Sequence, residues 1–166
     1  MSIKMIAAVG ENNELGKNND LIWHFYKDMQ FFRKMTIDKT VIMGSKTFES
    51  LPKELDRRVS IVLTSKNLEK YYDVIVYHKM EDILKAYLYS KDEVFIIGGA
   101  KLYEQFLPWC DTIYLTEIKA SDPDAEVFFP EFNKNEWHRK IIDKQEEKAI
   151  KFEHVRYVRK KVKNER

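Results

Sequence analysis

The chain has 166 residues and a mass of 19.9 kDa, with 44% hydrophobic residues and a formal net charge of only +2. This length favours one domain, and the apolar content excludes a disordered chain. No apolar run approaches the roughly 20 residues of a membrane span. The N-terminal segment also lacks the pattern of a signal peptide, so we expect a cytoplasmic protein.

The residue types available for metal and nucleic-acid binding narrow the possible partners. The single cysteine, Cys110, excludes an internal disulfide and a thiol-based zinc site, and the four histidines share no metal-ligand spacing. Residues 156–166 hold six Lys and Arg against one Glu. A basic tail can contact nucleic acid, but a solvated last strand over residues 152–162, with alternating Phe152, His154 and Tyr157, explains it better. We therefore expect no metal, nucleic acid or membrane partner.

Eight segments have the apolar patterns of strands, and four segments between the early ones have helical spacing. The predicted strands are 3–9, 40–44, 59–64, 74–77, 94–97, 112–118, 137–144 and 152–162. The predicted helices are 26–35, 46–51, 80–89 and 101–107.

The apolarity of these segments predicts how they are arranged. Runs such as 41–43 and 95–97 are apolar on both faces, as central parallel strands are. The last two predicted strands are longer and more polar, and no helix separates them. The pattern therefore predicts a single α/β domain over residues 1–166. We expect a mostly parallel central sheet of about eight strands, flanking helices and an antiparallel C-terminal edge.

Three of the predicted strands end in residues that suit an anionic ligand. The three turns are Gly44-Ser45-Lys46-Thr47, Thr64-Ser65-Lys66 and Gly98-Gly99-Ala100-Lys101. In an open parallel sheet, ligands bind beyond the carboxyl ends of the strands, and free N–H groups at a helix start attract phosphate. Ser or Thr in one such turn is usually only a helix cap. Three such turns in one small sheet favour a ligand with several phosphates.

The two common nucleotide-binding motifs are absent. A P-loop needs glycine directly before its lysine, and here Ser45 precedes Lys46. No G-x-G-x-x-G follows the first predicted strand, so the usual dinucleotide fingerprint is missing as well.

One carboxylate, that of Asp28, falls on the apolar face of the predicted helix 26–35. We expect that face to consist of Phe25, Met29, Phe32 and Thr36. A carboxylate there is costly to bury unless it is hydrogen-bonded or protonated. Asp28 either lies at the edge of the face and caps the helix start, or points into a pocket lined by Met29 and Phe32. In that pocket it could bind a flat polar heterocycle through paired N–H donors.

Several short segments, in this order and at this spacing, resemble the dihydrofolate reductase family over nearly the whole chain. They are Ile6-Ala7-Ala8, Leu15-Gly16-Lys17-Asn18-Asn19, Leu21-Ile22-Trp23, Asp28, Phe32, Thr36, Val41-Ile42-Met43-Gly44, Thr47-Phe48-Glu49-Ser50-Leu51, Arg58, Leu63-Thr64-Ser65, Ile97-Gly98-Gly99-Ala100, Tyr103-Glu104-Gln105-Phe106 and Tyr114-Leu115-Thr116. Each segment alone is modest evidence, but together they are highly specific.

The resemblance implies NADPH-dependent reduction of 7,8-dihydrofolate to 5,6,7,8-tetrahydrofolate for one-carbon metabolism. Asp28 would hold the pterin N3 and 2-amino groups and favour protonation at N5, Thr116 would support its carboxylate, and Trp23 would shape the site and hold a water. Arg58 would bind the carboxylate of the glutamate tail. The residues implied to line the substrate pocket are Ile6, Ala8, Met29, Phe32, Leu51, Leu55 and Ile97.

The resemblance also implies a cofactor site and a mobile lid. Lys46 and Thr47 would bind the diphosphate, residues 64–66 the adenosine 2′-phosphate, and a cis peptide at Gly98-Gly99 would lie beside the diphosphate. Residues 10–23 would form the lid over the nicotinamide. The implied cofactor-binding residues are Ala8, Leu15, Gly16, Asn19, Gly44, Ser45, Lys46, Thr47, Leu63, Thr64, Ser65, Lys66, Ile97, Gly98, Gly99, Ala100, Lys101, Leu102, Tyr103 and Gln105.

The chain departs from the family pattern at four places. Ile22 and Tyr26 stand where the family usually has proline, and Ser45 stands where it often has arginine. The usual Gly-Asp-Thr before Phe-Pro is replaced by residues 125–127, Ala-Glu-Val. The two missing prolines concern the lid and the entry to the helix rather than the implied chemistry. Ser45 removes one partner for the 2′-phosphate, and residues 125–127 concern the loop contacts that close the lid.

Two alternatives stay open at this point. One is a reductase of the same fold that acts on another pterin or pyrimidine intermediate, as in riboflavin synthesis. Asp28 and Arg58 argue against it, because that substrate has no glutamate tail. The other is a non-catalytic nucleotide-binding module. For the favoured interpretation we expect a monomer that binds dihydrofolate, NADPH and antifolate inhibitors.

Overall fold

The computed structural model describes residues 3–70 and 72–161, and its centre is an eight-stranded sheet. The strands are β1 (Ile3–Val9), β4 (Thr40–Gly44), β5 (Val59–Leu63), β6 (Ile75–Tyr77), β7 (Val94–Gly98), β8 (Thr112–Ile118), β10 (Trp137–Glu147) and β11 (Ile150–Arg159). Every predicted strand is present, with ends that differ by no more than three residues. Val162, the predicted end of the last strand, lies outside the described residues.

Four helices accompany the sheet. They are α1 (Tyr26–Thr36), α2 (Ser45–Ser50), α3 (Met80–Tyr87) and α4 (Ala100–Phe106), joined by the short 3₁₀ turns η1 (Leu68–Lys70), η2 (Leu107–Trp109) and η3 (Lys134–Glu136). All four helices match predicted ones. In the described part of the chain, no helix is long and apolar enough to cross a membrane.

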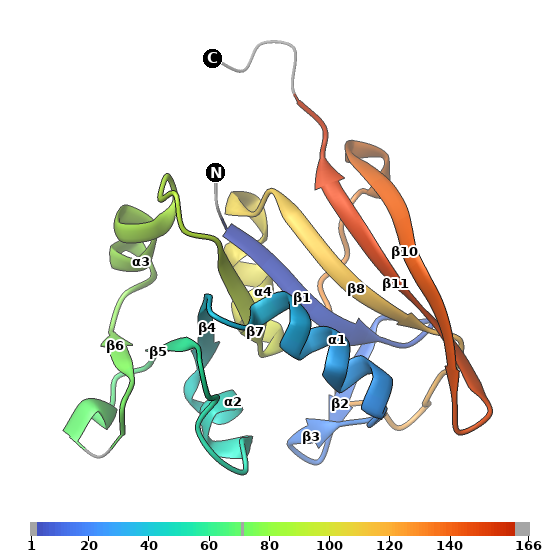
Figure 1. Ribbon diagram of the computed structural model, residues 1–166, viewed down its shortest axis with the longest axis horizontal. Coiled ribbons are helices and arrows are strands. Elements are labelled where there is room, and N and C mark those ends of the chain that lie inside the picture. The colour runs from blue at the N-terminus through green and yellow to red at the C-terminus, as the bar shows by residue number, and fades with distance from the viewer. Residues whose placement is uncertain (1–2, 71, 162–166) are drawn as a thin grey trace.

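The strand order is β10-β11-β8-β1-β7-β4-β5-β6 (Figure 1). All neighbours from β8 to β6 are parallel, whereas β11 pairs antiparallel with both β8 and β10. This confirms the predicted α/β architecture with a mostly parallel sheet and an antiparallel C-terminal edge. The carboxyl ends of β4, β5 and β7 therefore lie at one edge of the sheet, where ligands bind in open α/β folds.

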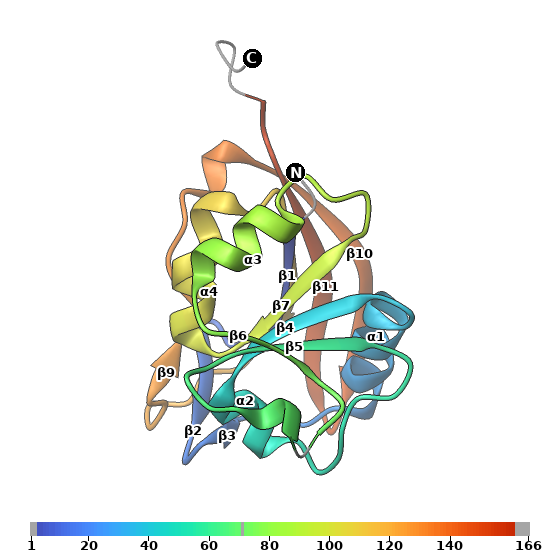
Figure 2. The ribbon, with the colours of Figure 1, turned by 90° about the vertical axis from the view of Figure 1, so that its left-hand side faces the viewer.

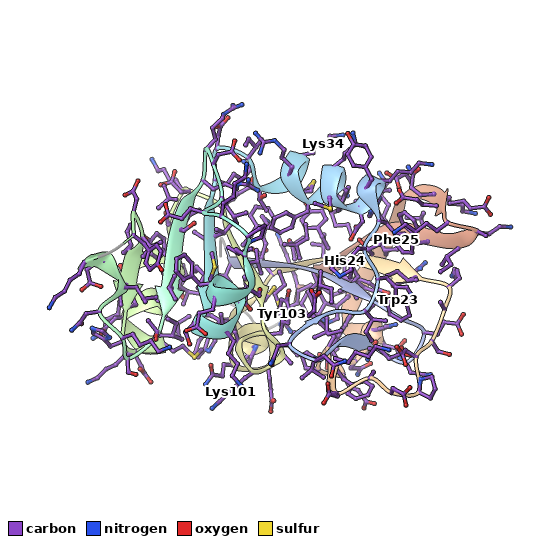
Figure 3. All side chains as sticks on the ribbon, turned by 90° about the horizontal axis from the view of Figure 1, so that it is seen from below. Trp23, His24, Phe25, Lys34, Lys101 and Tyr103 are labelled. Carbon is purple, nitrogen blue, oxygen red and sulfur yellow. The ribbon has the colours of Figure 1, made fainter. Side chains whose placement is uncertain are left out.

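Helices cover both faces of the sheet. Phe31 of α1 and Phe48 of α2 pack with Phe95 of β7 in the apolar cluster on one face. Ile83 of α3 and Phe106 of α4 belong to the larger cluster on the other face. Figures 2 and 3 show α1 and α4 on opposite sides of the sheet. Apolar side chains on both faces explain why the central strands have continuous hydrophobic sequences.

The last strand differs from the prediction of a solvated edge strand. β11 lies between β10 and β8, so β10 is the edge. The Phe152, Val155 and Tyr157 side chains of β11 are fully buried. The Arg and Lys residues near the C-terminus had suggested solvent exposure. The apolar positions between them pack on both faces of the sheet, Val155 and Tyr157 in the larger cluster and Phe152 against Phe25 and Ile118.

A second, three-stranded sheet was not predicted. It pairs β2 (Glu14–Lys17) with β3 (Asp20–Leu21) and β9 (Val127–Phe128), in the order β3-β2-β9. The turn between β2 and β3 is Asn18-Asn19, and both residues have positive φ angles, 52° and 59°. Asparagine tolerates this conformation, which two-residue hairpin turns require. Strands of two to four residues carry too short a pattern to be recognised from sequence.

Candidate active site

The polar turns singled out in the sequence lie side by side. Gly44 at the end of β4 is the register partner of Leu63 on β5, and Met43 is that of Gly98 on β7. A Cβ atom placed on Gly98 would lie 3.4 Å from the Thr47 hydroxyl of α2. The three turns therefore form one surface at the carboxyl edge of the sheet.

The helices α2 and α4 begin at this surface directly after glycines. The residues before their first turns are Gly44 and Gly99, and no described side chain caps either helix start. The interpretation that a hydroxyl group of the first turn merely caps α2 is therefore wrong, and the turn before α4 holds no Ser or Thr. Uncapped N–H groups, with the helix dipole behind them, attract anions such as phosphate.

Gly98 can only be a glycine here. Its φ angle is +129°, a region that L side chains rarely adopt. A Cβ atom would make only ordinary contacts, 3.4 Å from the Thr47 hydroxyl and 3.5 Å from the Tyr103 hydroxyl, so the backbone conformation rather than a lack of space favours glycine. The Gly98-Gly99 peptide bond is cis, as the resemblance implies.

The third turn is built differently. The Thr64 hydroxyl accepts a hydrogen bond of 3.2 Å from the Lys66 N–H, so it serves the turn itself. Lys66 Nζ lies 2.6 Å from Glu49 Oε1 of α2, and both side chains are more than half exposed. Ser65 is exposed beside them. His78 also joins this turn, because its Nδ1 lies 2.7 Å from the Thr64 carbonyl oxygen. No sequence pattern around this histidine indicated a role for it.

The other residues implied for the cofactor occupy three environments. Leu15 and Leu102 are buried in the larger apolar cluster, and Tyr103 is buried with its hydroxyl donating to the Ile6 carbonyl at 2.7 Å. Lys101 and Gln105 are exposed on α4. Gly16 and Asn19 lie in the β2-β3 hairpin. In Figure 3, Tyr103 and Lys101 mark α4 on one side of the sheet and Lys34 marks α1 on the other.

Asp28 does not cap α1. Its Oδ1 accepts hydrogen bonds from Thr116 Oγ1 of β8 at 2.5 Å and from His154 Nε2 of β11 at 3.0 Å. The Asp28 side chain is 22% exposed. Asp28 is therefore held on the sheet side of α1, and the capping alternative is wrong.

The second carboxylate oxygen of Asp28 is available to a ligand. Two donors already occupy Oδ1, and within residues 3–70 and 72–161 no donor reaches Oδ2. A carboxylate oxygen accepts about two hydrogen bonds. The geometry suits a heterocycle that offers N–H donors to Oδ2.

An apolar wall adjoins this carboxylate. Ile6 is buried, and Phe32, Leu51, Leu55 and Ile97 pack against the same cluster, so these five predicted pocket residues lie together. Met29 does not join them, because its side chain is 64% exposed. Phe31, which was not singled out, is the buried residue of the α1 face instead. The buried face of α1 therefore differs from the predicted face by about one position.

Ala8 and Trp23 lie on another part of the site. Both pack against the small cluster of Phe25, Ile118 and Phe152. Trp23 also touches the start of the predicted lid, since a Cβ atom on Gly10 would lie only 2.6 Å from its ring. Figure 3 shows Trp23 and Phe25 on the segment that leads into α1.

The two neighbouring arginines point in different directions. The Arg57 side chain is 61% exposed and pairs with Asp38, whereas the Arg58 side chain is 4% exposed. Arg58 Nη1 donates to Thr36 Oγ1 at 3.1 Å, and its guanidinium carbon lies 5.9 Å from the centre of the Phe32 ring. Burial, followed by the charge of Arg33, lowers the pKa of Arg58. Arg58 is thus the arginine that lies against the apolar wall.

The predicted lid segment is tied to the loop before β9. The buried Glu14 carboxylate accepts from the N–H groups of Asn12 and Asp122, both at 2.7 Å. Lys17 Nζ lies 2.5 Å from Asp122 Oδ2, and Glu126 Oε1 accepts from the Asn18 N–H at 2.5 Å. The two loops therefore remain in contact although the family's Gly-Asp-Thr is replaced by Ala-Glu-Val.

A residue far along the chain caps the helix that carries Asp28. The residue before α1 is Phe25, whose side chain cannot accept a hydrogen bond. Glu147 supplies the missing acceptor, with its carboxylate accepting from the Tyr26 N–H at 2.6 Å and the Lys27 N–H at 2.9 Å. Proline at position 26 would lack this donor, which gives the departure from the family pattern a structural reason.

We expect Glu147→Gln to lower the melting temperature at neutral pH, because the helix start loses its charged acceptor. The hydrogen bond from the Lys27 N–H, and then that from Tyr26, hold the pKa of Glu147 below its ordinary 4.5. A lowered pKa stabilises the fold above pH 4.5, and this stabilisation is lost as the pH falls through the lowered value. The difference between variant and wild type should therefore shrink on acidification.

Thermal unfolding from pH 3 to 8 measures this effect. Glu146→Gln is the matched control, because only the backbone carbonyl of Glu146 takes part, accepting from Lys27 Nζ. A melting temperature of Glu147→Gln equal to that of the control at every pH would show that the cap does not stabilise α1.

These features define a class of protein: an α/β enzyme with an anion-binding edge for a nucleotide and a carboxylate beside an apolar wall. Comparisons with known proteins agree. Residues 2–159 match the family model described as "Dihydrofolate reductase". The chain is 40% identical over 137 residues to dihydrofolate reductase of Haemophilus influenzae, covering 82% of this chain and 84% of that protein.

Two further relatives extend over more of the chain. Dihydrofolate reductase of Bacillus subtilis is 34% identical over 163 residues, which is 95% of each protein. The structure of dihydrofolate reductase from Enterococcus faecalis complexed with NADP(H) and RAB-propyl superposes with a TM-score of 0.86 at 29% identity, covering 96% of each chain. The chain belongs to the dihydrofolate reductase family, whose members are NADPH-dependent oxidoreductases.

Proposed function

We propose that this protein reduces 7,8-dihydrofolate to 5,6,7,8-tetrahydrofolate with NADPH, and that Asp28 is its catalytic carboxylate. The observation that carries the proposal is the position of Asp28, whose Oδ2 is open to a ligand next to the apolar wall. A pterin presents an N3–H and a 2-amino group that suit this oxygen. Asp28 orients the ring, and its negative charge favours protonation at N5.

The neighbouring residues hold the Asp28 carboxylate, enclose the substrate and bind its glutamate tail. Thr116 holds the Asp28 carboxylate, and Trp23 shapes the site and holds a water. Ile6, Phe32 and Ile97 enclose the pterin and benzoyl groups, and Met29 covers them from its exposed position on α1. Ala8, Leu51 and Leu55 complete the substrate contacts. Arg58 binds the glutamate tail through its planar, charged fork.

The anion-binding edge fits the cofactor. The uncapped starts of α2 and α4 provide N–H groups, and Gly98 allows close approach of the backbone. We propose that Lys46 and Thr47 bind the diphosphate and that residues 64–66 bind the 2′-phosphate. NADPH, when bound, supplies the hydride. The segment 10–23 serves as the lid that excludes water.

Loss of absorbance at the NADPH band, measured with and without dihydrofolate, tests the proposal. Dihydrofolate-dependent loss supports it. Loss only with another pterin or pyrimidine substrate would favour a different reductase of the same fold. Binding of NADPH without turnover of any of these substrates would favour the non-catalytic module. A cytoplasmic, monomeric, single-domain state over residues 1–166 and inhibition by antifolates remain predictions of the same interpretation.

We expect a preference for NADPH over NADH of more than tenfold. A hydrogen bond to a charged group contributes roughly 1.5–3 kcal/mol, or about 10–150-fold in affinity. The double variant Ser65→Ala with Lys66→Ala should raise the KM for NADPH and leave that for NADH nearly unchanged. The preference should also weaken at high salt, because these side chains are exposed.

Lys85→Ala is the control for a general loss of positive charge, since Lys85 is exposed on α3. Equal loss of both cofactors in the double variant would mean that these residues support the turn and that the 2′-phosphate is bound elsewhere. His78 would then be the next side chain to test, because its Nδ1 contacts the same turn.

A further inference from the structure

Three side chains from three elements form a continuous chain from Asp28 to the surface. His154 Nε2 lies 3.0 Å from Asp28 Oδ1, and His154 Nδ1 lies 2.7 Å from Asp143 Oδ1 of β10. The His154 side chain is only 2% exposed, whereas that of Asp143 is 38% exposed. The buried ring therefore bridges the candidate catalytic carboxylate and a carboxylate at the protein surface.

The hydrogen-bonding geometry requires a protonated ring when both carboxylates are ionised. An ionised carboxylate only accepts hydrogen bonds, whereas a neutral imidazole has one nitrogen without a proton. Since both ring nitrogens face carboxylate oxygens, both must donate, and only the imidazolium form does so. Burial acts to lower the pKa of His154, but hydrogen bonds to Asp28 and then Asp143 outweigh it and raise the pKa above 6.5.

The surroundings of the ring hold it in place. Phe31 of α1 stacks on it with ring centres 3.8 Å apart and planes 9° apart, and the Phe152 ring lies edge-on at 5.7 Å. Thr116 is the register partner of His154 on β8 and donates to the same Asp28 oxygen. The ring therefore cannot turn away from either carboxylate without losing its stacking.

Four polar or charged groups face His154 from the surrounding elements. They are Asp28 of α1, Asp143 of β10, Thr116 of β8 and Arg156, which lies two residues along β11 on the same face. The two carboxylates are the groups hydrogen-bonded to the ring nitrogens. The two carboxylates therefore determine whether the ring holds its second proton.

We propose that His154 is a positioning residue for the reaction, which holds Asp28 through its protonated ring and links that carboxylate to Asp143. This inference rests on the proposed function. The imidazolium fixes Asp28 Oδ1, so that Oδ2 is directed to the ligand. Its positive charge also offsets part of the Asp28 charge that favours protonation of the substrate. The pH dependence of turnover is thus set partly by Asp143, a residue outside the pocket.

Two variants distinguish the effect of the His154 charge from the effect of its hydrogen bond to Asp28. Asp143→Asn leaves the His154 contact with Asp28 intact, but the amide can donate to Nδ1 and so allows a neutral ring. His154→Phe removes the charge and the hydrogen bond while keeping an aromatic ring against Phe31. In both variants the Asp28 charge is less compensated at neutral pH. The basic limb of the pH profile of turnover should therefore move to higher pH.

We expect this limb to move by roughly 0.5–1 pH unit in both variants, less than the 1–3 units produced by a charge within about 4–6 Å of the titrating group. His154→Phe should also lower kcat, because it alone loses the hydrogen bond to Asp28. Asp82→Asn is the matched control, since it removes one exposed carboxylate on α3, which packs on the opposite face of the sheet. It should leave the profile unchanged.

A second measurement does not depend on activity. NMR titration of the His154 ring in the free wild-type protein should give a pKa above 6.5, and Asp143→Asn should lower it. A His154 pKa at or below 6.5 that does not respond to Asp143→Asn would overturn the proposal. So would an unshifted pH profile in both variants of an enzyme that turns over dihydrofolate. Absence of turnover in the wild type would instead refute the proposed function.

Discussion

Asp28→Asn is expected to lower turnover of dihydrofolate at neutral pH by about 10²–10⁴-fold, the range typical of lost acid–base assistance. Asparagine keeps the size of the side chain but removes the negative charge that favours protonation of the pterin. Thr116 Oγ1 and His154 Nε2 lie 2.5 and 3.0 Å from Asp28 Oδ1, so the amide oxygen can still be held in place. The loss should therefore appear mainly in kcat at saturating substrate.

The pH dependence of this variant is equally informative. At low pH a larger fraction of the substrate is protonated before it binds, so part of the lost rate should return. Steady-state kinetics from pH 5 to 9 measure both effects. Asp38→Asn is the control, because Asp38 pairs with Arg57 at the surface, where both side chains are 61% exposed. A wild-type rate for Asp28→Asn at neutral pH would show that another group assists the proton transfer.

The second large effect is expected at Arg58. Arg58→Leu should raise the KM for dihydrofolate by about 10–150-fold, the equivalent of losing a hydrogen bond of roughly 1.5–3 kcal/mol to a charged group. Arg57→Leu should change it little, since Arg57 is directed to solvent and Asp38. Arg58 lies instead against Phe32 of the apolar wall, with its side chain 4% exposed.

A substrate without the glutamate tail distinguishes the loss of one binding contact in Arg58→Leu from a general defect in folding. A dihydropterin without the glutamate tail should be reduced equally by Arg58→Leu and wild type, because the lost contact is with the tail alone. Arg58→Lys should recover only part of the affinity, since an ammonium group keeps the charge without the planar fork. If Arg57→Leu showed the larger rise in KM, the tail would be bound by Arg57 instead.

The surroundings of Asp28 show which features of the site could be predicted from the sequence and which could not. The position of a carboxylate among apolar residues at helical spacing correctly indicated a partly buried, hydrogen-bonded group. The predicted apolar face nevertheless included Met29, which is 64% exposed, and omitted Phe31. Periodicity defines a face only to within about one position, because neighbours on a helix lie 100° apart. The stacking of Phe31 on His154 decides which residue is buried.

No local sequence pattern indicated the contacts that Glu147 and His154 make with distant segments of the chain. Glu147 caps α1 from 120 residues away, and His154 reaches Asp28 across 126 residues. An alternating strand pattern places residue 154 on a face but does not reveal that a helix carboxylate lies opposite it. A glutamate near a hairpin turn is likewise usually a solvated surface residue. Only the packing of α1 on β11 and the β10-β11 hairpin brings these groups together.

Local sequence patterns were sufficient to predict the strands and helices of the main sheet, its α/β class and the three polar strand ends. Local propensity and hydrophobic period specify such elements, and parallel strands with intervening helices permit few arrangements. The tertiary structure alone decided that Gly44 and Gly99 leave two helix starts uncapped, and that Arg58 rather than Arg57 faces the apolar wall. It also placed His154 between two carboxylates. These features depend on long-range contacts, whose free energies are realised only when the sheet and helices have assembled.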